Sequence, residues 1–212
     1  MNIELKNVKP AYMSEDEISF SDIYLQDTVT FEKGKKYLIK AGSGRGKTSL
    51  LNFIYGSNPN FDGAILYSHS PLKNSALFDL RKTKISYVFQ DLKLFSGLSV
   101  IENIQLKNRI TRYKTTEEIE GLLDRVKLGF KRESPAKTLS LGQKQRVAII
   151  RALCQPFEFL LLDEPFSHLD DENSGIIATI IQEELAGQQA GLILTSLGNE
   201  SERFDYDLIL NL

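Results

Sequence analysis

The sequence predicts an α/β fold with a mostly parallel sheet and a helical insertion. Three observations indicate this fold: short apolar runs typical of strands recur along the chain, a strand, a helix and another strand follow closely in the C-terminal part, and the stretch before them has a helical pattern instead. Strand–helix–strand spacing of this kind favours parallel pairing with right-handed crossovers. The 212 residues match the length of one domain, and we expect residues 1–212 to form it.

The first part of the chain is expected to form strands around one helix. Residues 3–8 and 23–31 alternate polar and apolar side chains, and Lys33 and Gly34 mark the turn that follows. Residues 37–39 form a short apolar run that ends in a glycine-rich loop. A helix is predicted after that loop, with Gly56 as its stop, because apolar residues recur there at helical spacing: Leu50, Leu51, Ile54 and Tyr55.

The second part is expected to contain the insertion and then the remaining strands. After a strand over 85–89, residues 92–153 are interpreted as a helical insertion. From about Ser99 onward the chain lacks long β-branched runs. Two capping boxes support this interpretation, one from Thr115 to Glu118 and one from Ser140 to Gln143. Three apolar runs are then predicted to form strands: 159–162, 192–194 and 208–210. A helix is predicted over 170–185, between the first two of them.

Composition excludes several classes of protein. The chain has 26 Lys and Arg against 28 Asp and Glu, a net charge of −2, so it is not a globally basic nucleic-acid binder. Its single cysteine, Cys154, excludes an internal disulfide framework and suits a reducing compartment. No apolar run approaches a membrane span, and the N-terminus lacks the core of a signal peptide. We therefore expect a soluble, cytoplasmic protein that can still dock on a membrane protein.

Residues 41–48, AGSGRGKT, follow a predicted strand and open a predicted helix. In this setting glycines let backbone N–H groups surround phosphate oxygens, and the helix N-terminus adds a positive dipole end. Lys47 is expected to reach the β- and γ-phosphates and Thr48 to ligate Mg²⁺. The alternative is a flexible turn with a surface lysine. The predicted nucleotide-binding residues of the loop are Gly42, Ser43, Gly44, Arg45, Gly46, Lys47, Thr48 and Ser49.

An acidic pair follows the apolar run at 159–162. Asp163 is expected at the carboxyl end of a buried strand, where open α/β sheets bind ligands, and there it would hold the metal. Glu164 points elsewhere and is placed to act as the general base toward a water that attacks the γ-phosphate. Taken alone, the run is an ordinary strand ending in an acidic turn; the loop at Lys47 favours the functional interpretation.

Residues 139–153, LSLGQKQRVAIIRAL, complete a resemblance to the ATP-binding cassette (ABC) ATPases that covers nearly the whole chain. The resemblance implies a P-loop NTPase core, an N-terminal antiparallel β subdomain and the inserted α-helical subdomain. Ser140 caps a helix whose N-terminus is a second phosphate-binding end. The resemblance implies that this end, with Gly142 and Gln143, faces ATP on another cassette, so that two chains sandwich two ATP molecules.

Further positions match the family pattern. Gln90 is similar to the loop glutamine that contacts Mg²⁺, and Asp170 to the key residue of the loop that communicates across the dimer. Tyr12 stands where the family has an adenine-stacking aromatic, although a surface tyrosine is an equal alternative.

The chain departs from the pattern at three positions. Ala41 replaces a loop glycine, Leu141 replaces a signature glycine, and Ser196 replaces the histidine that bonds the γ-phosphate. Ser196 is retained as a catalytic candidate that can donate a hydrogen bond but is shorter than histidine.

The leading functional hypothesis is the ATP-hydrolysing subunit of an ABC transporter at the cytoplasmic face of a membrane. It would work as a homo- or heterodimer with another cassette and power a separate membrane permease, docked near Phe95, Leu98, Val100 and Ile101. Residues 87–103 and the short C-terminus resemble exporters of the lipoprotein-release and macrolide-efflux type. One alternative is an ATP-binding switch with weak hydrolysis that pairs with a complete partner. Another, a soluble ABC protein acting on nucleic acid or ribosomes, is disfavoured by the near-neutral charge.

Overall fold

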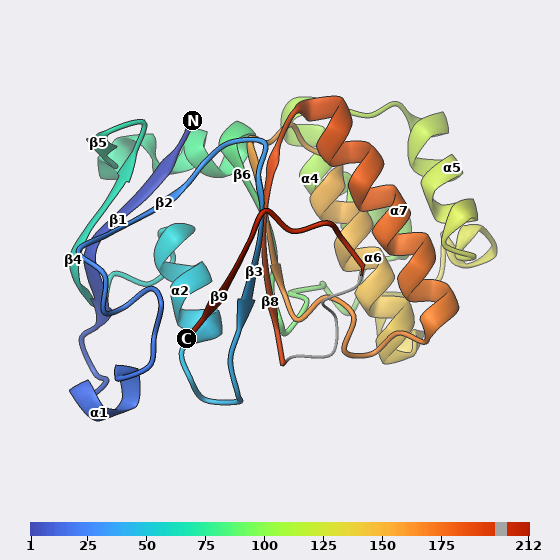
Figure 1. The fold of residues 1–212 in the computed structure, drawn as a ribbon. Coiled ribbons are helices and arrows are strands. Elements are labelled where there is room, and N and C mark those ends of the chain that lie inside the picture. Colours follow the sequence, from blue (N-terminus) through green and yellow to red (C-terminus); the bar gives the residue numbers. More distant parts are fainter. Residues whose placement is uncertain (198–202) are drawn as a thin grey trace.

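A five-stranded sheet runs through the middle of the molecule (Figure 1). The computed structural model describes residues 1–197 and 203–212. The strand order is β6-β7-β8-β3-β9, and every neighbouring pair is parallel, as predicted. Every residue of β6, β7 and β8 is buried, which explains their continuous apolar runs. The strands are β3 (Lys36–Lys40), β6 (Ile85–Val88), β7 (Phe159–Asp163), β8 (Gly191–Ser196) and β9 (Leu208–Asn211).

A second, antiparallel sheet lies beside the first, and helix α2 (Lys47–Ile54) is held between the two (Figure 1). Its order is β2-β1-β4-β5, which confirms the antiparallel N-terminal subdomain. Two of its strands, β4 and β5, follow α2 and were not predicted, since glycine and proline interrupt their pattern. The strands are β1 (Ile3–Pro10), β2 (Thr28–Phe31), β4 (Phe61–Tyr67) and β5 (Ser70–Pro71).

The strand predicted over 23–31 was wrong in its first half. Only Thr28–Phe31 pairs with β1, and the residues before it form turns after the short helix α1 (Glu15–Ile18). The cause is local: the Ser21 hydroxyl accepts hydrogen bonds from the N–H groups of Ile23 (3.1 Å) and Tyr24 (2.8 Å). Serine in this role folds the backbone back on itself, so the alternation there reflects a packed turn.

Helices cover the other face of the parallel sheet and extend away from it as the inserted segment (Figure 1). Both predicted capping boxes are present, and Ser99 with Glu102 forms a third. The long helices are α4 (Val100–Thr111), α5 (Thr116–Arg125), α6 (Leu141–Leu153) and α7 (Asp171–Gln188). Short helical turns complete the fold: η1 (Asn74–Ala76), α3 (Leu77–Asp79), the π-helical η2 (Leu80–Lys84), η3 (Gly129–Lys131) and η4 (Ala136–Thr138).

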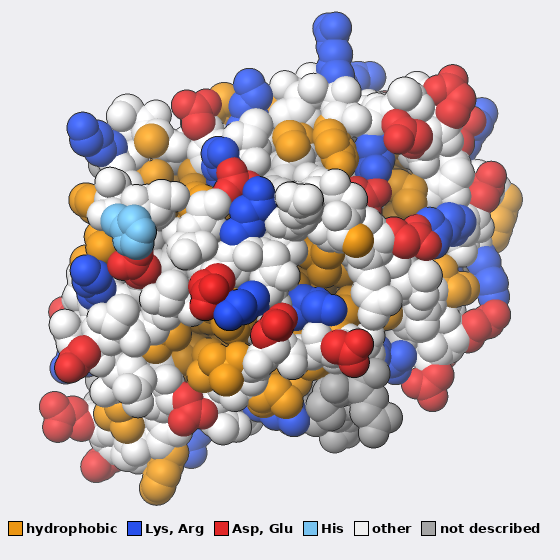
Figure 2. Space-filling model, turned by 45° about the horizontal axis from the view of Figure 1, so that its top comes forward, with side chains coloured by type: hydrophobic (Ala, Val, Ile, Leu, Met, Phe, Trp, Pro, Cys, Tyr) orange, Lys and Arg blue, Asp and Glu red, His pale blue; other side chains and the backbone are white. Residues whose placement is uncertain are grey.

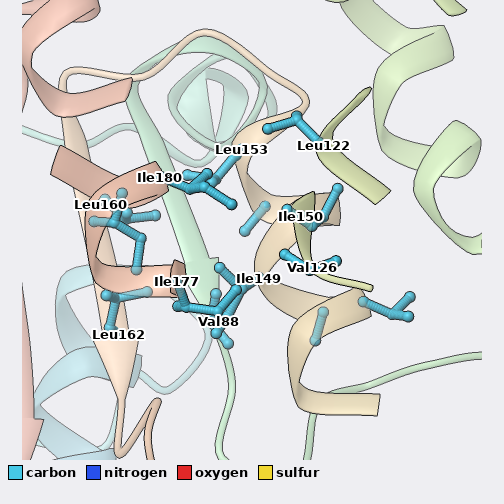
Figure 3. Close-up of a cluster of buried hydrophobic side chains, with 14 of the residues drawn as sticks. Val88, Leu122, Val126, Ile149, Ile150, Leu153, Leu160, Leu162, Ile177 and Ile180 are labelled. Carbon is cyan, nitrogen blue, oxygen red and sulfur yellow. The ribbon is translucent and has the colours of Figure 1, made fainter. Parts of the chain in front are cut away.

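Two apolar clusters hold these layers together, one on each face of the parallel sheet. Strand β7 contributes to both, because successive side chains of a strand point to opposite faces. Leu160 and Leu162 pack against the helices, as Figure 3 shows, whereas Phe159 and Leu161 pack toward α2. This double burial fixes the position of the strand end, where Asp163 is the last strand residue and Glu164 follows it.

The surface has mixed charge. On the face seen in Figure 2, basic and acidic side chains are interspersed. Along the described residues, none of the helices combines the length and apolar character needed to cross a membrane.

Candidate nucleotide site

The glycine-rich loop connects β3 to α2 as predicted. Gly44 (φ +76°) and Gly46 (φ +88°) occupy the left-handed region, where glycine is favoured. Gly46 is the N-cap of α2 and has no side chain to satisfy the N–H groups of the first turn. Ala41 does not adopt positive φ, so the loop does not require glycine there. The loop therefore presents the amide end of a helix, which suits an anion.

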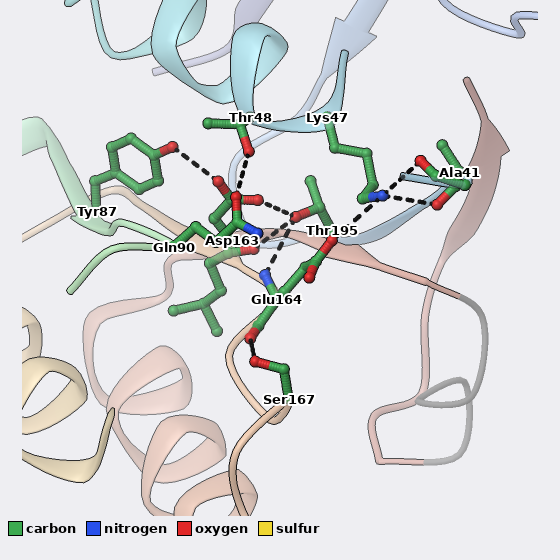
Figure 4. A network of polar contacts seen from close by, with 11 residues as sticks. Ala41, Lys47, Thr48, Tyr87, Gln90, Asp163, Glu164, Ser167 and Thr195 are labelled. Carbon is green, nitrogen blue, oxygen red and sulfur yellow. Dashed lines mark hydrogen bonds and ion pairs between the residues drawn. The ribbon is translucent and has the colours of Figure 1, made fainter. Parts of the chain in front are cut away.

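Lys47 lies under the loop and is almost fully buried, at 5% exposure. Its ammonium group donates to the carbonyl oxygens of Ala41 (2.7 Å) and Gly42 (2.9 Å). It also forms an ion pair with Glu164, 3.3 Å between Nζ and Oε1 (Figure 4). The charge is thus fixed at the base of the loop. The alternative of a surface lysine on a flexible turn is wrong.

Asp163 ends β7 and is completely buried. The Thr195 hydroxyl donates to its Oδ1 (2.7 Å), and the Tyr87 hydroxyl lies 3.5 Å from its Oδ2 (Figure 4). Burial raises the pKa of this carboxyl, and hydrogen bonds from Thr48 and Thr195 offset part of the rise. A cation beside Asp163 would favour the ionised form.

Thr48 and Gln90 meet next to this carboxylate. The Thr48 hydroxyl donates to Gln90 Oε1 over 3.2 Å, which links the first turn of α2 to the segment after β6. Hydroxyl, amide and carboxylate oxygens are the ligands that Mg²⁺ accepts. The predicted metal set of Thr48, Gln90 and Asp163 is therefore brought together by three separate elements.

Glu164 has an unusual backbone for a glutamate. Its φ of +48° lies in the left-handed region, and its N–H is close to both the carbonyl (3.2 Å) and the hydroxyl (3.3 Å) of Thr195. Its carbonyl accepts a hydrogen bond from the Ser167 hydroxyl (3.0 Å). The strand has turned at this point, so the carboxylate points into the hollow beside Lys47 whereas Asp163 stays buried.

A hollow of about 330 Å³ opens above the loop. Tyr12 reaches it from β1's end, and its hydroxyl contacts the Ser49 hydroxyl. Arg45 is exposed and donates to the Glu17 carbonyl of α1 (3.2 Å). Sequence reasoning did not identify Met13, which follows Tyr12 and also lines the hollow. The lining residues are Tyr12, Met13, Ser43, Gly44, Arg45, Gly46, Lys47, Thr48, Ser49, Gln90 and Glu164.

The signature segment does not line this hollow. Ser140 caps α6, accepting the Gln143 N–H over 3.3 Å, while Gln143 Oε1 accepts the Ser140 N–H over 3.0 Å. A β-carbon on Gly142 would stand 2.6 Å from the His168 carbonyl oxygen, so close packing alone requires glycine there. Asp170 caps α7 through the Asn173 N–H (2.8 Å), and this hydrogen bond holds the pKa of its carboxyl below the ordinary value.

Ser196 ends β8 close to the loop, since its carbonyl accepts the Ala41 N–H (3.3 Å). Its side chain is buried and does not line the hollow. The neighbouring Thr195, which sequence reasoning passed over, holds Asp163 and Glu164. Its position directly after the apolar run of β8 was the available signal, because Asp163 follows the apolar run of β7 in the same way.

Comparison with known proteins agrees with this geometry. A family model described as "ABC transporter" matches residues 25–167. The uncharacterised ABC transporter ATP-binding protein YclH of Bacillus subtilis is 31% identical over 185 residues, which cover 85% of this chain and 80% of YclH. The macrolide export ATP-binding/permease protein MacB of Campylobacter jejuni is 36% identical over 175 residues, 80% of this chain but only 27% of MacB.

A solved structure leads to the same result. The dimeric bacterial ABC transporter cassette MJ0796 superposes with a TM-score of 0.78 at 27% identity, covering 99% of this chain and 94% of that one. The likeness therefore extends over both sheets and the helical insertion. The chain belongs to the ABC transporter ATP-binding family, whose members are nucleotide-binding ATPases.

Proposed function

We propose that this chain binds ATP with Mg²⁺ in the hollow above residues 41–48 and hydrolyses it to power a membrane permease. The observation that carries the proposal is the convergence of Lys47, Thr48, Gln90, Asp163 and Glu164 at the carboxyl edge of the parallel sheet. Ligands of open α/β sheets bind at this edge. Residues 1–212 then act as one cassette, with 92–153 as the insertion.

The donor set fits Mg²⁺ that arrives with a nucleotide. Among the described residues no group of three or more His, Cys, Asp or Glu side chains could hold an ion by itself. Mg²⁺ is commonly bound through one or two protein oxygens together with substrate phosphates. Thr48, Gln90 and Asp163 would supply the protein oxygens, and Lys47 would compensate phosphate charge.

Glu164 is the proposed general base. Its carboxylate reaches the hollow beside Lys47, where a γ-phosphate would lie. A water there would transfer a proton to Glu164 as its oxygen attacks phosphorus, and ADP would leave. Tyr12, at the rim and 53% exposed, is available to stack on adenine.

The partner cassette is proposed from the signature end of α6. Ser140 and Leu141 are exposed there, away from the hollow of their own chain. The relative MJ0796 is described as dimeric. Two chains placed head to tail would bring the α6 N-terminus of one to the phosphates on the other, with Asp170 at the contact.

The permease is proposed to dock between the parallel sheet and the insertion. A hollow of about 200 Å³ there is lined by aromatic rings and by Leu106, and Phe95 stands 60% exposed at it. Val100, which sequence reasoning placed on this surface, is fully buried in the core and cannot dock a partner.

The likeness to MacB, a macrolide export protein by name, favours a lipoprotein-release or macrolide-export type and a place at the cytoplasmic face of a membrane.

A second candidate function is an ATP-binding switch with weak or no hydrolysis, a degenerate cassette that pairs with a complete partner. Ser196 and Leu141 favour this function, because they stand where the family has a histidine and a glycine. Loss of one transition-state donor costs ~10²–10³ in rate.

Steady-state ATPase measurement with Mg²⁺ tests these proposals, with Glu164→Gln as the key variant. We expect measurable turnover in the unmodified chain. The variant should keep its ATP affinity, lose turnover ~10²–10⁴-fold, and elute as a dimer with ATP. The surface variant Glu32→Gln is the matched control. ATP binding without turnover in either chain would favour the switch, and absence of ATP binding would overturn both functions.

A further inference from the structure

We propose that Thr195 is a positioning residue that sets the metal-binding Asp163 and the general base Glu164 relative to each other. The inference rests on the proposed function, because it takes the roles of both carboxylates from it. Thr195 is completely buried and does not line the nucleotide hollow. Any effect on catalysis must therefore pass through the residues it holds.

One hydroxyl serves both acidic residues. Thr195 Oγ1 donates its proton to Asp163 Oδ1 over 2.7 Å and lies 3.3 Å from the N–H of Glu164, whose hydrogen bond it accepts. A hydroxyl can donate one hydrogen bond and accept others, so the two contacts are compatible. Figure 4 shows the threonine between the two residues. A side chain with only a donor or only an acceptor could not make both contacts.

The sheet register places the hydroxyl. Thr195 is paired with Asp163 in the β7–β8 ladder, the last pair before β7 ends. The carbonyl of Leu162, at 3.4 Å, is a weaker alternative acceptor for the same proton. Strands β7 and β8 are buried throughout, so this anchor belongs to the rigid part of the fold.

Glu164 needs an anchor because its backbone is strained. A glutamate with φ of +48° occupies a region that costs a non-glycine residue free energy. Such conformations persist only where surrounding contacts hold them, and the Glu164 N–H is held by Thr195 through both carbonyl and hydroxyl. Removing the hydroxyl would weaken that hold and release one oxygen of Asp163 at the same time.

The test compares Thr195→Val, which replaces the hydroxyl by a methyl group, with Thr195→Ser, which keeps it. Supporting residues of this kind typically contribute 10- to 100-fold to metal affinity or activity. We expect the valine variant to lose kcat by about this factor, with ATP affinity in the absence of Mg²⁺ unchanged in calorimetry. The gain in ATP affinity on adding Mg²⁺ should shrink. The serine variant should behave like the unmodified chain in all three measurements.

Ser86→Ala is the matched control. Ser86 is an equally buried hydroxyl of the same sheet, and it donates to the Ala152 carbonyl (2.7 Å) away from the nucleotide hollow. The Ser86→Ala substitution should lower the melting temperature of the chain without changing its kcat. An unaltered kcat in Thr195→Val would overturn the inference, as would equal losses in the valine, serine and Ser86 variants, which would indicate a general loss of stability.

Failure of the proposed function gives a different result. Glu164→Gln is measured beside these variants. If it retains turnover, the assignment of the base is wrong whatever Thr195 does. If it loses turnover and Thr195→Val does not, only the positioning role is refuted.

Discussion

Replacing Lys47 by methionine should weaken ATP binding more than any other single change in the loop. Methionine keeps the length and apolar stem of lysine but removes the charge. In the structure two donors of the ammonium group are used by Ala41 and Gly42, and the remaining one faces Glu164 at 3.3 Å. We expect a phosphate oxygen to take this last position when ATP binds.

The expected loss of ATP-binding free energy follows from that single contact between Lys47 and a phosphate oxygen. A hydrogen bond to a charged group contributes roughly 1.5–3 kcal/mol. Two unit charges about 4 Å apart attract by roughly 4 kcal/mol at an effective dielectric constant of about 20, which sets the upper limit. A loss of about 2–4 kcal/mol corresponds to an ATP dissociation constant roughly 30- to 700-fold higher.

Isothermal titration calorimetry of ATP against both chains measures this change. Lys35→Met is the control, since Lys35 carries the same charge in an exposed pair with Glu32. Thermal melting without nucleotide reports whether the Lys47 variant is folded. A folded variant whose ATP dissociation constant lies within threefold of the unmodified chain would refute the placement of the phosphates at Lys47.

Three further predictions concern other positions. Ser196→His should raise kcat if the absent histidine limits turnover; an ATPase assay showing no gain would mean that the chain is limited elsewhere. Ser140→Ala removes the cap of α6, so we expect about 1 kcal/mol less stability in denaturant unfolding, and unchanged stability would contradict the capping role. Burial alone would raise the pKa of Glu158, but hydrogen bonds from Lys84 and the N-terminal ammonium lower it to about 2. Its stabilisation is therefore present above pH 4.5 and lost as pH falls toward 2. Melting temperatures of Glu158→Gln should fall less steeply over that window, and parallel curves for both chains would refute the assignment.

Strands and caps were the most predictable part of the fold. β7 and β8 are apolar along their whole length because both faces of the parallel sheet are covered, and such runs are evident without a structure. The Ser140 and Thr115 capping boxes are equally local, because each involves residues only three apart. The strand prediction for residues 23–27 was wrong although the cause is also local: the Ser21 hydroxyl bends a segment whose alternation of polar and apolar residues is typical of a strand.

By itself, the sequence determined the chemistry of the loop, the order of the five parallel strands along the chain and the presence of two adjacent carboxylates at the end of β7, since these depend on neighbours in the chain. The tertiary structure decided which of these groups meet. Gln90 reaches Thr48, Glu164 turns to Lys47, and Thr195 joins the Asp163 carboxylate to the backbone N–H of Glu164, because strands distant in sequence end at one edge of the sheet. Those contacts depend on register and on the turn of the backbone at Glu164, which no pattern of neighbouring residues specifies.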